Sequence, residues 1–442
     1  MSAVVLAFHR TFDSMRVRNF RIYLAGMAVS TTGIWIHTVA SAWLVLRLSG
    51  SGVALGLLLA LEFLPILVLG AFGGVVADRF DKRRTLIVTQ TAFAVLALSL
   101  GALVAFQVVQ LWMVYAVALV QGLVTAVDHP TRQAFVPEIV GKRNLANAVG
   151  LNSAVFTGTR IVGPAIGAGI IAAVGIAPGY LLDGVSYLAV VVSLCAMRSA
   201  ELRPAERAPE GERGVLDGLR YVWSSRELRL PLLLMSVLFT FSFNWFVFMP
   251  LLAERTFDGD ARTYGLILSM MGVGSFVGAL VLAHRARPGR RLLALAAVAV
   301  GVLSVAAGIA PTFGWELGIV VLLGLASIAF MITGNTTLQL TADPAMRGRV
   351  MSLYSVVFLG STPIGAPIAG WVGEHLGART GLILGGLIAA AGGLTALWAL
   401  RRASRTARER AAEHEAEVVE HTVVLDTPAP DTEPAVERSL SA

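Results

Sequence analysis

The sequence predicts an all-α membrane protein in which twelve transmembrane helices form two pseudo-symmetric bundles of six. Composition, uncharged runs of helix length and an internal repeat lead to this prediction. Of 442 residues, 56% are hydrophobic and 14% are charged, and the mean hydropathy is +0.74. Soluble proteins carry about 25% charged residues, so the composition excludes a water-soluble fold. The one cysteine, Cys195, excludes an internal disulfide framework and a cysteine-rich metal site.

Runs without Asp, Glu, Lys or Arg locate the helices, because about 20 apolar residues cross a ~30 Å hydrocarbon layer. Runs long enough for one helix each are 22–46, 230–253, 263–283, 292–315, 317–342, 350–373 and 380–400. The run 85–127 is about twice the length of one span, so we expect two helices with a turn at 107–110. Three more helices each contain one ionisable residue: 53–77 with Glu62, 145–173 with Arg160, and 180–197 with Asp183.

The chain is expected to divide into two halves, a linker and a tail. Residues 1–198 form the first six-helix bundle and residues 229–400 the second. Residues 199–228 form a polar cytoplasmic linker whose last part has the apolar stripe of an interfacial helix. Residues 401–442 are charged and contain proline, which predicts a disordered cytoplasmic tail.

The two halves resemble each other at a constant offset of 202 positions. The matched residues are Leu151, Ser153, Val155, Phe156, Gly158, Gly163 and Ile166 with Leu353, Ser355, Val357, Phe358, Gly360, Gly365 and Ile368. Duplicated bundles of this kind place a substrate site between the halves, near mid-membrane.

The positive charges predict the orientation, because cytoplasmic segments of membrane proteins are rich in Lys and Arg. With both termini in the cytoplasm, nearly all of the 35 Lys and Arg residues lie on the cytoplasmic side. The exceptions are Arg47, Arg255, Arg262 and Arg379 in external loops and Arg160 inside the membrane. We expect a multi-pass protein of a bacterial inner membrane. Arginines among the first 21 residues favour a short interfacial helix over a cleavable signal peptide.

A charged loop follows the helix over 53–77 and reads GGVVADRFDKRR over residues 73–84. It is similar to the G-x-x-x-D-R-x-x-R/K-R/K signature of the major facilitator superfamily, with Asp81 where that family usually has glycine. The resemblance implies that Asp78 faces the N-terminus of the helix that begins near Val350, where the helix dipole stabilises an acid.

From this motif we expect a gate that closes the cytoplasmic side. Gly74 would let another helix approach closely, and Arg83 could pair with Asp128 at the cytoplasmic end of the fourth helix. The expected gate residues are Gly74, Asp78, Arg79, Arg83 and Asp128. The alternative is that residues 79–84 only anchor the loop at the membrane surface.

The helix over 145–173 carries a second motif, Gly158, Gly163, Pro164 and Gly167. It resembles the G-P-x-x-G-G signature of the exporting, antiporter branches of the superfamily, with Ala168 in place of the last glycine. Pro164 removes a backbone hydrogen bond, and the glycines let another helix pack closely. Ordinary helix packing would explain the same residues.

Other segments narrow the resemblance to exporters of the enterobactin-exporter and macrolide-efflux type. These segments are 20–26, 33–40, 63–65, 128–138 and 347–352, and the resemblance covers about residues 16–400. It implies secondary active efflux of a small amphipathic molecule, such as a drug, macrolide or siderophore, in exchange for protons by alternating access. The fold by itself does not fix the substrate.

Ionisable residues inside the membrane are functional candidates, because each is costly unless paired. His37 and Glu62 lie about 15 Å from the outer ends of their helices. We expect Glu62, with His37, to bind and release protons; a hydrogen-bonded structural pair is the alternative. Arg160 lies near mid-depth, where it either donates to carbonyls or contacts an anionic substrate or Glu62.

Asp183, Asn152 and Asn244 are further candidates for the proton or substrate site. Asp183 is placed about three residues inside its helix, so solvation is the expected alternative. The asparagines either line a cavity or form hydrogen bonds between helices. Aromatic residues that could line an apolar pocket are Trp35, Trp43, Phe239, Phe241, Phe243 and Trp245.

We expect neither cofactor nor metal, and no catalytic residue. The sequence has no phosphate-binding loop for ATP and no nucleophile–base pair, so an enzyme is not expected. The expected partners are a small-molecule substrate, protons and the lipid bilayer, without nucleic acid, and the chain is expected to act as a monomer. Alternative functions are a lipid or lysolipid transporter of the same fold, or a non-transporting membrane sensor or scaffold that uses the tail.

Overall fold

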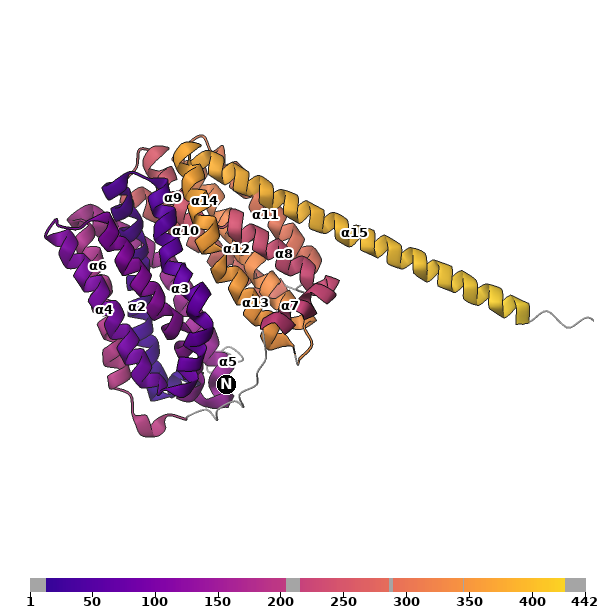
Figure 1. The fold of residues 1–442 in the computed structure, drawn as a ribbon, viewed down its shortest axis with the longest axis horizontal. Helices are drawn as coiled ribbons and strands as arrows, with labels where there is room; N and C mark the ends of the chain where they lie inside the picture. The colour runs from indigo at the N-terminus through magenta and orange to yellow at the C-terminus, as the bar shows by residue number, and fades with distance from the viewer. Residues whose placement is uncertain (1–12, 204–214, 286–288, 345, 426–442) are drawn as a thin grey trace, which may run out of the picture. The chain divides into compact units, whose positions relative to one another are not determined.

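The structure is a computed structural model that describes residues 13–203, 215–285, 289–344 and 346–425 (Figure 1). Over these residues the regular elements are helices, and 12 helical spans are long and apolar enough to cross a membrane. The predicted all-α membrane fold is therefore confirmed. A 3₁₀ turn, Asp13–Arg16, precedes the first span. Residues 1–12, most of the expected N-terminal interfacial helix, lie outside the described residues.

The six spans of the first half are built from α2 (Arg18–Ser49), α3 (Gly52–Arg79), α4 (Lys82–Ala105), α5 (Leu111–Val174) and α6 (Ile176–Cys195). The predicted turn at 107–110 separates α4 from α5. α5 contains two spans that meet at Gly141. Gly141 has a φ of 71°, a left-handed conformation that glycine adopts without steric cost.

The turn between α3 and α4 explains how Asp81 replaces the glycine usual in the superfamily. Asp81 has a φ of −61°, so the turn does not need a left-handed residue. Its carboxylate accepts a hydrogen bond of 2.8 Å from the backbone N–H of Arg84 and so caps α4.

The spans of the second half are built from α8 (Arg226–Phe241), α9 (Trp245–Arg255), α10 (Ala261–Arg285), α11 (Arg290–Gly308), α12 (Phe313–Thr341), α13 (Arg347–Gly360), α14 (Thr362–His375) and α15 (Ala378–Leu425). Two spans that the sequence predicts as single helices are interrupted. One breaks at 242–244 between α8 and α9, and the other at Ser361 between α13 and α14. The Asn244 side chain donates a hydrogen bond of 2.8 Å to the Thr240 carbonyl, which satisfies one backbone group at the first break.

Two short helices lie in the linker: η2 (Ser199–Glu201) and α7 (Val215–Ser224). The Tyr221 hydroxyl of α7 donates a hydrogen bond of 2.8 Å to Asp343, in the loop before α13. Residues 204–214 lie outside the described residues. α8 begins at Arg226, slightly before the expected boundary at 229.

The last helix, α15, continues to Leu425, so residues 401–425 are helical where the sequence predicts disorder. Ala, Glu and Arg, which dominate this stretch, are strong helix formers. Thr395–Ala442 forms a unit separate from Met1–Leu394.

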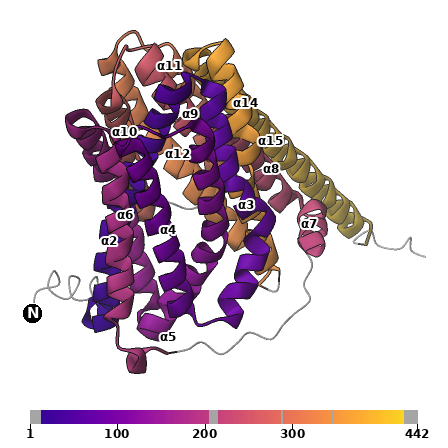
Figure 2. The ribbon, with the colours of Figure 1, turned by 60° about the vertical axis from the view of Figure 1, so that its left-hand side comes forward.

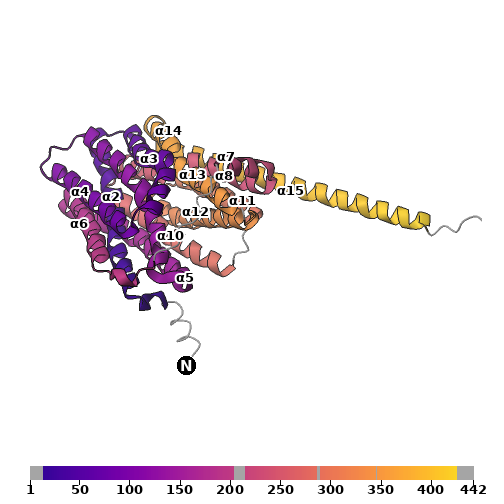
Figure 3. The same cartoon turned by 60° about the horizontal axis from the view of Figure 1, so that its bottom comes forward.

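The helix bundle has two ends, at the bottom and top of Figures 1 and 2. We call the bottom end, which holds the turn between α3 and α4, the linker side, and the opposite end the far side. Within the first half, α2 packs against α5 and α6, and α4 packs against α6 (Figures 1 and 3). Between the halves, α3 packs against α14 and α5 packs against α10.

Candidate functional site

A buried histidine–aspartate pair lies inside the first half. His37 on α2 and Asp183 on α6 approach until Nδ1 is 2.9 Å from Oδ2. The Asp183 side chain is fully buried and that of His37 is 16% exposed. His37 lies about 18 Å from the far-side end of α2. Because a carboxylate at membrane depth is costly unless paired, this pair is the centre of the candidate site.

Neighbouring residues hold the pair in place. Gly33 lies one helical turn before His37, and a Cβ there would lie 2.8 Å from Asp183 Oδ1 and overlap the Ser186 hydroxyl. Glycine therefore lets α6 approach α2 at this point. Tyr180 meets the His37 ring edge-on with 5.1 Å between centroids, and its hydroxyl lies 3.0 Å from that of Ser41.

Glu62 approaches the pair from α3. It is half-buried and close enough to His37 for their charges to interact. The Gln121 side chain, on the first span of α5, also contacts the His37 ring. Glu62 is thus near His37, as the sequence predicts, but the ion-pair partner of the imidazole is Asp183.

Asp183 lies deeper than the sequence predicts. Gly175, with a φ of 92°, ends α5, and α6 begins directly at Ile176 rather than near residue 180. Asp183 is therefore about 10 Å inside the helix and is fully buried. The alternative that Asp183 is solvated is therefore wrong.

Arg160 lies where the two halves meet. Its guanidinium is over the Trp35 ring, 5.8 Å from the centroid. The Trp35 ring also lies 6.2 Å from that of Phe156 and 6.3 Å from that of Phe246 in the second half. Among the described residues Arg160 has no hydrogen bond and no ion pair, so the expected contacts with carbonyls or Glu62 are not found. Asn152, two turns earlier on α5, is half-buried.

Three of the six aromatic candidates, Phe239, Phe243 and Trp245, belong to a cluster in the core of the second half. The Phe239 ring lies 5.2 Å from Phe243, 6.0 Å from Phe330 and 5.1 Å from Phe358. Phe239 and Trp245 are buried, whereas Phe241 is exposed. This cluster packs around the break between α8 and α9 at Asn244.

The glycine motif of α5 packs against two neighbouring helices. A Cβ at Gly167 would lie 2.9 Å from Ile36 Cα, and a Cβ at Gly163 would overlap the Trp35 side chain. On another side, the Pro164 carbonyl lies 2.7 Å from where a Cβ on Gly265 of α10 would be. Gly158, in contrast, faces open space.

The predicted ion pair between Arg83 and Asp128 is wrong. Arg83 instead donates hydrogen bonds to the carbonyls of Leu194 (2.8 Å) and Cys195 (3.1 Å) at the end of α6. Asp128 is out of its reach because the first span of α5 continues to Gly141, which places Asp128 about 20 Å from the linker-side end of that span.

Asp128 forms a buried network within the first half. It pairs with Arg132 at 2.7 Å and accepts hydrogen bonds from Thr89 (2.7 Å) and Gln90 (2.8 Å) of α4. Arg132 lies one turn later on α5, next to Tyr23 in a buried apolar cluster. The network therefore joins α4 and α5 rather than the two halves.

The other residues of the expected gate lie at the linker-side end of α3. Gly74 faces open space, and the close approach expected of it is made by Gly73, where a Cβ would overlap the Ala126 carbonyl of α5. Arg79 is exposed, and the side chain of Asp78 lies outside the described part of the chain. Lys82 pairs with Glu138 at 2.7 Å, within the first half.

The far side carries a polar contact between the halves that the sequence analysis missed. Glu374, at the end of α14, accepts hydrogen bonds from the Ser51 hydroxyl and from the backbone N–H of Val53 (2.9 Å), at the N-terminus of α3. Arg255, at the end of α9, donates to the Gly50 carbonyl. The sequence shows an acid at the end of one span and a helix start at the end of another. Only the packing of the two halves brings these two ends together.

Glycines show how closely the halves approach at each depth. Near the far side, the backbone of α3 at Gly52 lies against α14 at Gly370. At mid-depth, Gly272 of α10 lies against the Arg160 carbonyl. Toward the linker side, glycines with open space beside them include Gly74, Gly150, Gly158 and Gly348, and on the far side Gly50, Gly169 and Gly377 have it too. The close approaches named here therefore lie on the far side and at mid-depth.

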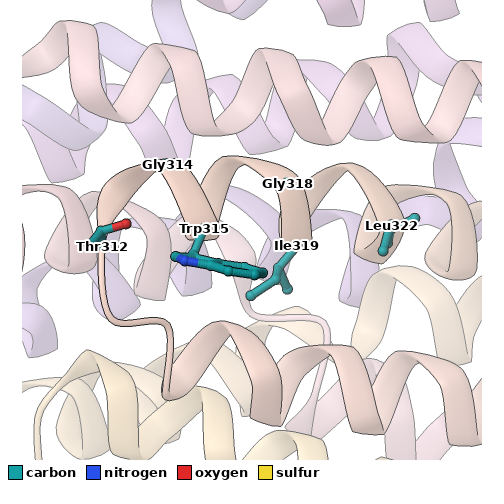
Figure 4. A pocket seen from close by; sticks show the side chains of 6 residues that line it. All are labelled: Thr312, Gly314, Trp315, Gly318, Ile319 and Leu322. Carbon is teal, nitrogen blue, oxygen red and sulfur yellow. The ribbon is translucent and has the colours of Figure 1, made fainter.

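A surface hollow of about 520 Å³ lies along the start of α12, and none of the candidate site residues lines it (Figure 4). Its lining residues are Thr312, Gly314, Trp315, Gly318, Ile319 and Leu322. Because they belong to one helix and the residue before it, the hollow is a feature of the outer helix surface. Glu316, on the same turn of α12, is fully buried and interacts with Arg379.

A family model described as transmembrane secretion effector matches residues 9–427. The chain is 28% identical to the staphyloferrin A transporter of Staphylococcus aureus, over 57% of this chain and 63% of that relative, which is less than two thirds of its length. It is 23% identical to macrolide efflux protein A of Streptococcus pyogenes, over 85% and 94% of the two chains. It is 26% identical to an enterobactin exporter of Shigella boydii, over 84% and 86%.

Among solved structures, the chain is similar to a bacterial homologue of the human lysosomal transporter Spinster in an inward-facing and unoccupied conformation. The TM-score is 0.68 with 14% sequence identity, over 86% of this chain and 96% of the other. At this identity the likeness shows the fold.

Proposed function

The chain belongs to the transmembrane secretion effector family of the major facilitator superfamily, and from this premise we propose that it exports a small amphipathic molecule in exchange for protons. The family consists of membrane transporters, not enzymes. Relatives named for staphyloferrin A, enterobactin and macrolides support a siderophore, macrolide or similar drug-like molecule as the cargo.

The observation that carries the proton-exchange proposal is the buried pair of His37 and Asp183 with Glu62 beside it. One proton added to a neutral imidazole beside an ionised carboxylate turns a net negative pair into a neutral one. Inside a membrane this difference in charge is costly enough to favour different packing of α2 against α6. Glu62 and His37 can therefore pass protons to and from the pair as access to it changes.

Alternating access is supported by where the halves touch. Polar contacts at Glu374 and Arg255 join the halves on the far side, while Gly74 of the first half and Gly348 of the second have open space beside them toward the linker side. We assign the linker side to the cytoplasm of a bacterial inner membrane, so this arrangement is an inward-facing one. In the opposite state, Asp78 would reach the N-terminus of α13 and close the linker side.

Reconstitution tests this proposal. The purified protein is placed in liposomes with an imposed pH gradient, and the movement of fluorescein, rhodamine 123 and a macrolide is followed together with internal pH. Wild-type protein should move cargo against protons. Asp183→Asn and Glu62→Gln should abolish gradient-driven movement and keep cargo exchange without a gradient.

Asp258→Asn provides the matched control, because Asp258 is an exposed acid in a far-side loop and asparagine tolerates its positive φ of 47°. This variant should transport as the wild type does. Full gradient-driven movement by Asp183→Asn would overturn the assignment of the proton site. A gradient that moves none of the three probes in wild-type protein would overturn proton-driven export.

A further inference from the structure

We propose that Arg160 and Trp35 form an anion-binding subsite of the transport path, for molecules that carry a carboxylate or phenolate on a flat aromatic body. The proposal rests on the proposed export function and names the class of molecule exported. Three observations support it: the charge of Arg160 has no partner, aromatic rings surround this charge, and the site lies between the two halves.

The positive charge of Arg160 is unmatched. Arg160 lies about 21 Å from the far-side end of α5, a depth at which an ionised group is costly unless it is partnered. No hydrogen bond, ion pair or nearby charge of the described residues compensates it. Two other arginines within spans have partners at 2.7 Å: Arg132 has the Asp128 carboxylate and Arg379 the Ala310 carbonyl. An anionic ligand would supply the missing counter-charge.

The rings around Arg160 fit a flat partner. Trp35 lies beneath the guanidinium, and the rings of Phe156 and Phe246 approach Trp35 at 6.2 and 6.3 Å. Aromatic rings at such distances bind further rings by stacking or edge contacts. The Trp35 Nε1 donor is buried and has no acceptor among the described residues. A ligand with an anionic oxygen would satisfy this donor as well as Arg160.

The subsite lies where a cargo must pass. Phe246 belongs to the second half, and Gly272 of α10 packs against the Arg160 carbonyl, so a molecule bound here touches both halves. Asn152, Phe156 and Arg160 are spaced by four residues and share one face of α5. Phe156 is 52% exposed, so the protein does not fully cover this side of the subsite.

The subsite is separate from the proton-binding pair but shares α2 with it. Trp35 and His37 are two positions apart, so their side chains point about 200° apart around the helix. Trp35 faces α5 and the second half, and His37 faces α6. A change of protonation that rotates α2 would thus also move Trp35, the ring under Arg160.

Binding of two dyes tests the proposal. Fluorescein and rhodamine 123 share a xanthene ring system, but fluorescein is an anion and rhodamine 123 a cation. Their affinities for the purified full-length protein are measured by fluorescence polarisation without any gradient. Arg160→Gln should weaken fluorescein binding by at least about tenfold and change rhodamine 123 binding little. Arg160→Lys should retain most of the fluorescein affinity.

Arg262→Gln, which removes an exposed far-side arginine, is the matched control and should bind both dyes as the wild type does. If Arg160→Gln does not fold, as judged by size-exclusion elution, Arg160→Met keeps the apolar stem and replaces it. Equal loss of both dyes, or unchanged fluorescein binding, would overturn the subsite. Because binding is measured without a gradient, a failure of proton-driven transport counts against the proposed export and leaves this test unaffected.

Discussion

Replacement of Glu374 by alanine should weaken the contact between the two halves on the far side. Its carboxylate accepts two hydrogen bonds at the N-terminus of α3. A charge-assisted hydrogen bond contributes about 1.5–3 kcal/mol, and a carboxylate at a helix N-terminus about 0.3–1 kcal/mol. Because Glu374 is half-buried, solvent screening lowers the combined contribution to about 1–2 kcal/mol. The loss should shift the balance toward a far-side-open state about 5–30-fold.

Spin labels on the two halves measure this shift. Arg47 and Asp258 are exposed far-side residues of different halves, and the one native cysteine, Cys195, can be replaced by serine. Double electron–electron resonance measures the distance between labels at positions 47 and 258. The fraction of molecules with a long distance between the labels should be larger in Glu374→Ala than in wild-type protein. Glu254→Ala, which removes a half-buried far-side glutamate without a hydrogen bond among the described residues, is the control. Identical distance distributions for the two alanine variants would refute the reasoning.

Three further outcomes follow from contacts inside the halves and from the tail. Gly33→Leu should lower the free energy of unfolding by about 1–3 kcal/mol, because the leucine side chain would overlap Ser186 and Asp183. Gly150→Ala should leave it unchanged, because Gly150 has open space beside it. Thermal unfolding in detergent compares the two variants. Asp128→Asn leaves Arg132 buried without its partner and should cost about 3–5 kcal/mol by the same measurement. Its effect should add to that of Arg83→Ala, and a coupling above about 0.5 kcal/mol would contradict their separation. Removal of residues 404–442 should leave gradient-driven dye movement in liposomes unchanged; its loss would favour a signalling or scaffolding function for the tail.

The number of spans and most of their bounds could be predicted because backbone groups inside a membrane must be satisfied within each helix. An apolar run of about 20 residues therefore predicts one transmembrane helix. Two breaks, at 242–244 and Ser361, escaped this reasoning. Side chains such as Asn244 satisfy carbonyls at a break, and hydropathy does not detect them.

The partners of the ionisable residues were harder to predict, because pairing depends on the rotation and depth of each helix. The sequence identified His37, Glu62 and Asp183 separately, but the close approach that joins His37 to Asp183 depends on Gly33 facing α6. The Arg83–Asp128 prediction failed for a related reason. It assumed a shorter fourth span, and a few extra turns moved Asp128 into the interior.

The junction at Gly141 has a mechanical consequence. The fourth and fifth spans meet there without an intervening loop, and the backbone N–H of Arg203 is hydrogen-bonded to the Glu138 carbonyl just before it (2.9 Å). A hinge is made of a few loop or element-terminal residues that absorb changes in φ and ψ. With no loop at this corner, a rotation of the fifth span against the fourth must be absorbed at Gly141, the non-helical residue of α5, and the hydrogen bond to Glu138 ties the stretch after the sixth span to the same corner.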